Sequence, residues 1–158
     1  MGLPSLQAVL QDIAAYLEEL RQTLVKEYEA LAAGDPGSMQ ATAETKQRLS
    51  AILEDLEQER LKQLRQAGLD LTRTGLMAYL GRHSQPDGHP LSQLWQRIET
   101  LTRDCERLNR VNGIIIAKQR QRAETALSIL KGQVLQPQLY SSQGAAVSAP
   151  QSKPIAKA

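Results

Sequence analysis

Residues 107–120 read RLNRVNGIIIAKQR, and this stretch carries two conflicting structural signals. Asn112-Gly113 is a strong short-range signal for a β-hairpin, and the three isoleucines that follow it favour a strand. The chain on both sides, however, has the spacing of an α-helix. Whether the backbone turns at Asn112-Gly113 or continues as a helix decides the fold of the C-terminal half.

The apolar spacing favours a continuous helix. A stripe with alternating steps of three and four residues continues through Asn112 without a change of register, and it comprises positions 91, 94, 98, 101, 105, 108, 112, 115, 119, 122, 126 and 129. This register predicts one helix over residues 91–131, roughly 60 Å long at 1.5 Å per residue, which Gly132 ends. We call this stripe the seam, because it is the line along which the helix should pack against others. We expect Asn109, Asn112 and Gly113 to have a structural role, because a polar residue on a buried seam can fix register or partner.

The N-terminal half predicts two further long helices. Apolar residues at 6, 10, 13, 17, 20, 24, 28 and 31 form a stripe that Ser5 can cap, and it stops at the helix breakers of residues 34–37. Ser38 is a plausible cap for a second helix that extends to Gly68. Because the connection is short, the two helices should pack antiparallel.

A short helix should follow, capped by Asp70 or Thr72 and ending near Leu80, and residues 81–90 should form a loop. The predicted fold is therefore all-α. We expect an elongated antiparallel helical bundle of three long helices and a short one, with coiled-coil-like packing, over residues 1–132. Residues 133–158 are rich in Gln, Ser, Ala and Pro, and we expect a flexible tail whose few apolar residues could anchor a partner.

The composition favours a thin layer of side chains between helices over a thick globular core. The chain has no Phe, one Trp and four Tyr, and its net charge is +2. Residues 1–60 contain 11 acidic and 5 basic side chains, whereas residues 61–158 contain 6 acidic and 14 basic ones. The two halves should attract each other, and the small total charge gives no reason to expect nucleic acid or membrane as a partner.

The sequence also suggests where the protein is located. A single cysteine, Cys105, excludes an intrachain disulfide and favours a reducing compartment. The first residues lack the features of a secretory signal, and no apolar run is long enough to span a membrane. We expect a soluble, cytoplasmic protein without membrane insertion.

No group of residues predicts catalysis, a cofactor or a metal site. His83, Asp87 and His89 could approach Cys105 only by chance of the fold, and a zinc site needs tighter spacing. Four carboxylates close together in the second helix could suggest acid–base chemistry, but a solvated helix face explains them better; they are Glu54, Asp55, Glu57 and Glu59. We expect a protein that is not an enzyme.

Six basic side chains lie along the long helix, and they are Arg103, Arg107, Arg110, Lys118, Arg120 and Arg122. A nucleic-acid surface would combine such a pattern with aromatic residues or a known motif, and both are missing. We expect these side chains to pair instead with acidic residues of the first two helices.

Several apolar residues of the long helix and the tail lie outside the seam. Ile114 and Ile116 flank Ile115 and point to either side of it, where a third helix could cover them or a partner helix could bind. Near the end of the long helix, further apolar residues share one face, and some continue into the tail. We take this set as the candidate residues for binding a partner: Ile114, Ile116, Ala123, Leu127, Leu130, Val134, Leu135, Leu139 and Tyr140.

Residues 106–132 resemble the C-terminal signature of the FlgN family. In that signature an Asn precedes Asn-Gly and a small aliphatic block, and a basic helix then ends in Leu and Gly. The matching residues are Asn109, Asn112, Gly113, Ile114 to Ile116, Arg120, Arg122, Leu127, Leu130 and Gly132. The looser N-terminal match comprises Leu24, Glu27, Leu31, Asp35, Lys46, Leu49, Leu53, Leu56, Arg60 and Gly68. The family's Tyr-Gly-x-x-Gly motif is matched only partly, because residues 140–144 read YSSQG.

The resemblance implies an all-helical bacterial flagellar export chaperone without enzymatic activity or cofactors. Its cargo would be unassembled hook–filament junction proteins of the FlgK and FlgL type. The resemblance implies that the C-terminal region binds this cargo, so the tail of residues 133–158 and the partner-binding residues given above would be cargo-binding. It would hold back their polymerisation and deliver them to the flagellar type III export gate or its ATPase components. We expect a monomer or a weak homodimer. A structural or adaptor coiled-coil protein without chaperone activity is the alternative.

Overall fold

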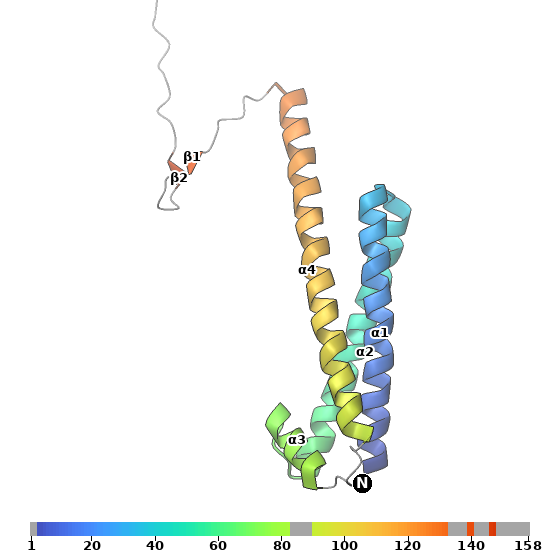
Figure 1. The fold of residues 1–158 in the computed structure, drawn as a ribbon. Helices are drawn as coiled ribbons and strands as arrows, with labels where there is room; N and C mark the ends of the chain where they lie inside the picture. The colour runs from blue at the N-terminus through green and yellow to red at the C-terminus, as the bar shows by residue number, and fades with distance from the viewer. Residues whose placement is uncertain (1–2, 83–89, 133–138, 141–145, 148–158) are drawn as a thin grey trace, which may run out of the picture. The chain divides into compact units, whose positions relative to one another are not determined.

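The computed structural model describes residues 3–82, 90–132, 139–140 and 146–147 (Figure 1). Its elements are α1 (Leu3–Ala33), α2 (Pro36–Gln66), α3 (Arg73–Arg82), α4 (Pro90–Leu130), β1 (Leu139–Tyr140) and β2 (Ala146–Val147). Three long helices and a short one confirm the predicted all-α fold class. The chain forms two compact units, Met1–Ala117 and Lys118–Ala158, and α4 contributes to both.

Asn112-Gly113 does not turn the chain. Residues 90–130 form one helix, as the continuous register predicted. The seam of α4 is buried or half-buried at every position from Leu91 to Ile115. In the unit that begins at Lys118, the predicted seam positions Arg122, Ala126 and Ile129 are instead exposed. The seam prediction is therefore confirmed for the first part of α4 and wrong for the second.

The connection between α1 and α2 differs in detail from the prediction. Asp35, and not Ser38, caps α2: its Oδ1 accepts hydrogen bonds from the backbone N–H groups of Gly37 (3.1 Å) and Ser38 (3.4 Å). Pro36 occupies the first helical turn, where its missing N–H costs nothing. Gly34 has a φ of 65°, which lets α1 end in a left-handed residue and allows the chain to reverse.

In the unit Met1–Ala117, α1 and α2 lie side by side and antiparallel, as predicted (Figure 1). The core is made mainly of leucine, and its fully buried members include Leu10, Leu24, Leu49, Leu64 and Leu91. With no phenylalanine to fill a thick core, the chain uses leucine layers between helices.

Helix α4 runs parallel to α1. Cys105 Sγ lies 3.5 Å from the backbone oxygen of Leu17, and Asn112 Nδ2 lies 2.9 Å from that of Leu24. Both pairs are separated by 88 residues, and a constant separation means that the two helices run in the same direction. From the first contact to the second, the contacting residue moves seven positions along each helix, and seven residues are the repeat of coiled-coil packing.

The short helix α3 begins after Thr72, whose hydroxyl oxygen accepts a hydrogen bond from the N–H of Gly75 (3.3 Å). Of the two predicted caps, Thr72 therefore caps the helix, while Asp70 binds Thr72 itself. Gly75 is required at its position, because a Cβ there would lie 2.4 Å from the backbone oxygen of Asp70.

Residues 133–158 were predicted to be a flexible tail. Within this segment the structure contains two short strands, β1 and β2, which pair antiparallel with Leu139 opposite Val147 and Tyr140 opposite Ala146. Strands of two residues produce no detectable periodicity, so the sequence could not predict them.

The Asp35 cap gives a first testable prediction. Its hydrogen bonds with Ser38 hold the pKa of the carboxyl below its usual value. The stabilisation should therefore be present above about pH 3.9, the unperturbed pKa, and be lost as the pH falls through the lower pKa of the folded state. We expect Asp35→Ala to lower the melting temperature by about 3 °C at neutral pH. Thermal melts followed by circular dichroism should give Asp35→Asn, which keeps a side-chain acceptor, a melting temperature close to that of the parent chain. An equal decrease for Asp35→Asn and Asp35→Ala would contradict the capping role.

Candidate functional site

A buried polar network joins α1, α2 and α4 at Asn112. The Asn112 side chain is fully buried, and its Nδ2 donates to the Leu24 oxygen and to Glu27 Oε2, the latter at 2.8 Å. Glu27 is only 5% exposed, and its other carboxylate oxygen accepts from Lys46 Nζ at 2.8 Å. Lys46 also donates to Asn109 Oδ1 at 3.3 Å. Through Asn109, Asn112 and Lys46, the network ties each of the three long helices to the other two.

The part of α4 after Asn112 presents apolar side chains to solvent. Ile114 is 51% exposed and Ile116 is 44% exposed, so the hypothesis that a third helix covers them is not supported. Val111 is also exposed, although the sequence did not single it out. Ile115, which lies on the seam, is half-buried. Of the three isoleucines, the two that flank the seam are therefore available to a partner.

In the unit Lys118–Ala158, the exposed apolar side chains lie near the end of α4. Leu127 is 53% exposed and Leu130 is 82% exposed. Ala123 is exposed as well, and so is Ile129, which the sequence had placed on the seam. Exposed leucines and isoleucines so close together are typical of a surface that binds a partner.

The tail residues of the predicted site are described only in part. Val134 and Leu135 lie outside the described residues. Leu139 and Tyr140 form β1. Their part in binding therefore stays a prediction.

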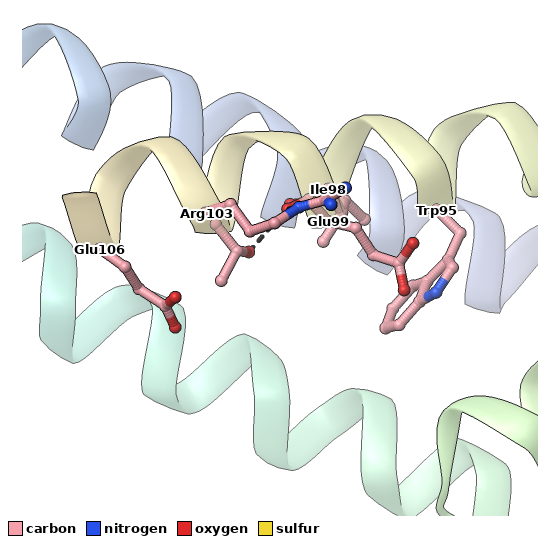
Figure 2. Close-up of a pocket in the computed structure, with 6 residues that line it drawn as sticks. Trp95, Ile98, Glu99, Arg103 and Glu106 are labelled. Atoms are coloured by element: carbon pink, nitrogen blue, oxygen red, sulfur yellow. Dashed lines mark hydrogen bonds between the residues drawn. The ribbon is translucent and has the colours of Figure 1, made fainter. Parts of the chain in front are cut away.

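Two cavities follow one face of α4. The larger has a volume of about 440 Å³ and is lined by Trp95, Ile98, Glu99, Thr102, Arg103 and Glu106. Figure 2 shows Trp95 and Glu106 projecting from α4 toward α2. The smaller cavity, of about 350 Å³, shares Thr102 and Glu106, and Leu17, Leu20 and Leu24 of α1 also line it. The sequence did not predict either cavity, because a cavity depends on how helices pack and not on the pattern of one helix.

Arg60 of α2 packs against Trp95, which lines the larger cavity. Its guanidinium carbon lies 5.3 Å from the centre of the Trp95 ring, a cation–π contact between α2 and α4. Nε and Nη2 of Arg60 also donate to the Glu57 carboxylate, at 2.7 and 2.6 Å. Burial of the arginine is tolerated because its charge is paired and its hydrogen bonds are satisfied.

Other polar residues that the sequence singled out are found apart from one another wherever the structure describes them. Burial raises the pKa of the Cys105 thiol to about 11, so the reactive thiolate is scarce at neutral pH. Glu54 and Asp55 are exposed, and Glu59 binds Gln63 of its own helix. His83, Asp87 and His89 lie outside the described residues, and within those that the structure describes no three His, Cys, Asp or Glu side chains could hold a metal ion.

The expected pairing of the basic residues of α4 with α1 and α2 is not found for Arg103, Arg107 and Arg110. Among the described residues, Arg107 pairs with Asp104 of its own helix at 3.7 Å, and Arg103 Nε donates to the backbone oxygen of Glu99. Long side chains on an exposed helix reach neighbours three or four residues away at the lowest cost. None of the helices described is long and apolar enough to cross a membrane.

Comparison with known proteins gives two matches. The family model described as FlgN protein matches residues 1–148. The chain is also similar to the crystal structure of a flagella synthesis protein, FlgN, from Pseudomonas aeruginosa, with 28% sequence identity and a TM-score of 0.66. That match covers 73% of this chain and 89% of the other. No curated protein matches the chain.

We predict that Asn112→Leu destabilises the fold, although leucine is the more apolar residue. The substitution removes the donor that satisfies the buried Glu27 carboxylate, which should cost about 2 kcal/mol. Urea unfolding would measure this cost. Because the two side chains interact, the double variant Asn112→Leu with Glu27→Leu should lose less than the sum of the two single variants; additive losses would contradict the network.

Gly113 should behave in the opposite way. A Cβ at this position would meet no atom within 4 Å, so Gly113→Ala should fit without strain. It should raise the free energy of unfolding by about 1 kcal/mol through helix propensity. The same urea experiment tests this, with Gly75→Ala, which clashes with Asp70, as the variant expected to lose stability.

Proposed function

Because the chain belongs to the FlgN family of flagellar proteins, we propose that it is a cytoplasmic export chaperone for unassembled hook–filament junction proteins of the FlgK and FlgL type. In this role it binds the cargo before assembly, prevents premature polymerisation and delivers it to the flagellar type III export gate or its ATPase components. The protein acts by binding and not by catalysis.

The observation that carries this proposal is the exposed apolar surface at the end of α4. Leu127, Ile129 and Leu130 are each more than half exposed, whereas the leucines of the core are buried. Exposed leucines of this kind suit an amphipathic helix from a partner, which would bury its own apolar face against them. Hook–filament junction proteins that polymerise through helical termini would offer such a face.

The surface is also basic. Arg120, Arg122 and Lys131 accompany the apolar residues, and Arg120 binds Glu124 at 2.9 Å in a pair that is largely exposed. Exposed pairs of this kind contribute little to stability and can be exchanged for a partner's charges. The position of these charges favours a cargo helix with acidic residues beside its apolar stripe.

The test is a titration of purified chain with a purified junction protein of the FlgK type. The variant Leu127→Asp with Leu130→Asp should weaken binding at least about tenfold, because it places charges in an apolar contact. Ser128→Asp, a control on the same turn, should bind normally. Unchanged binding by the double variant would remove this surface as the cargo site.

Failure of the parent chain to bind any junction protein would contradict the chaperone role itself. In that case a structural or adaptor coiled-coil protein becomes the better interpretation. Export of junction proteins into the medium, measured in cells that carry the double variant, gives an independent readout of the same role.

A further inference from the structure

The end of α4 carries a local concentration of positive charge. Residues 118–131, which lie within the unit Lys118–Ala158, contain four basic side chains and a single acidic one, Glu124. The basic residues are Lys118, Arg120, Arg122 and Lys131, and all four are exposed. The whole chain, by contrast, has 19 basic and 17 acidic side chains. The charge is therefore a property of this helix end and not of the composition.

The apolar side chains of this segment share one face of the helix. Their spacing of i, i+3, i+4 and i+7 places them on one side: Ala123, Ala126, Leu127 and Leu130. All four are exposed, and the exposed fraction reaches 53% for Leu127 and 82% for Leu130. The opposite side is polar and uncharged, and it consists of Gln121, Thr125 and Ser128. The end of α4 is therefore an amphipathic helix whose apolar face is open to solvent.

Basic side chains border this apolar face on both sides. At about 100° per residue, Arg120 and Lys131 lie along one edge of the face, and Arg122 lies along the other. Lys118 precedes Arg122 by one turn. Glu124 lies on the first edge, where it binds Arg120 at 2.9 Å in a largely exposed pair. Each edge therefore keeps a net positive charge.

Positive charge on both edges fits a flat anionic surface more simply than it fits a single helix. A protein helix would have to place acidic residues on both flanks of its own apolar stripe. A bilayer that contains anionic lipids presents negative charge in every direction around an apolar side chain that enters it. Charge complementarity therefore favours a lipid surface as a partner for this segment.

We propose that residues 118–131 bind the surface of an anionic lipid bilayer, with the helix axis in the plane of the membrane. Leu127 and Leu130 enter the boundary between headgroups and acyl chains. Arg120, Arg122 and Lys131 keep their charged ends among the lipid phosphates, because long basic side chains can bury their stems and still reach polar groups. The helix lies on the bilayer and does not cross it.

The proposal does not rest on the proposed function, because it concerns the chain alone. It has a consequence for that function, since Leu127 and Leu130 also form the surface assigned to cargo. Lipid and cargo therefore exclude each other. A chain without cargo is held at the membrane, with its exposed leucines removed from water, and a bound cargo releases it.

Sedimentation of the full chain with vesicles tests the proposal. Vesicles of phosphatidylcholine alone are compared with vesicles of equal parts phosphatidylcholine and phosphatidylglycerol. The chain should sediment with the anionic vesicles and stay in solution with the neutral ones, because two leucines alone bind weakly. High salt should release it, because salt screens the charges. A chain that binds neither kind of vesicle, or both equally, overturns the proposal and leaves this surface to a protein partner.

Two double variants separate the charge contribution from the apolar one. Arg120→Glu with Arg122→Glu should weaken binding to the anionic vesicles at least about tenfold, because it reverses the charge beside both edges of the face. Leu127→Gln with Leu130→Gln keeps the charge and the helix propensity. This variant should also weaken binding at least about tenfold, because no large apolar side chain then enters the bilayer.

A matched control changes the net charge by the same amount elsewhere on α4. Arg107→Glu with Arg110→Glu alters two exposed residues of the unit Met1–Ala117 and should bind the vesicles as the parent does. Circular dichroism should show the parent's helix content in all three variants, since every altered side chain is exposed. An equal loss of binding in the control, or normal binding of Leu127→Gln with Leu130→Gln, overturns docking through this face.

Discussion

The side-chain amide of Asn112 directs both of its hydrogens into α1, and the arrangement of the three long helices depends on this contact. A shift of α4 by one turn would leave the buried Asn112 amide without its partners and would remove the donor to one oxygen of the buried Glu27 carboxylate, which keeps only its bond to Lys46. The leucine layers supply most of the stabilisation, but leucines tolerate several registers. The Asn112 amide fixes one of these registers between α4 and α1. Lys46 of α2 binds the same Glu27 carboxylate and so joins α2 to this contact.

Much of the fold could be predicted from the sequence, because helical periodicity is a property of one segment at a time. The register from Leu91 to Ile115 was sufficient to reject a hairpin at Asn112-Gly113. The cap of α2 was misplaced at Ser38, since both Asp35 and Ser38 have suitable side chains and only their geometry separates them. Beyond Ala117 the seam was predicted too far, because periodicity shows which face is apolar and not whether another helix lies against it.

The candidate site was predicted less completely for the same reason. Ile114 and Ile116 stood out because they flank the seam, and Leu127 and Leu130 because they share one face near the end of α4; all four are exposed. The partners of Asn112 could not be predicted, because Glu27 lies 85 residues away and no local pattern connects the two. The cavities could not be predicted either, because the smaller one is lined by residues of α1, α2 and α4, which no single segment brings together.

The contact between Arg60 and Trp95 has an optical consequence. Trp95 is the only tryptophan of the chain, so all of its indole fluorescence originates at the cavity between α2 and α4. The indole is half-buried beneath a guanidinium group, an environment whose polarity changes when the cavity is filled or when α2 moves. The protein therefore carries its own spectroscopic reporter, and its emission follows the state of one cavity without an added label.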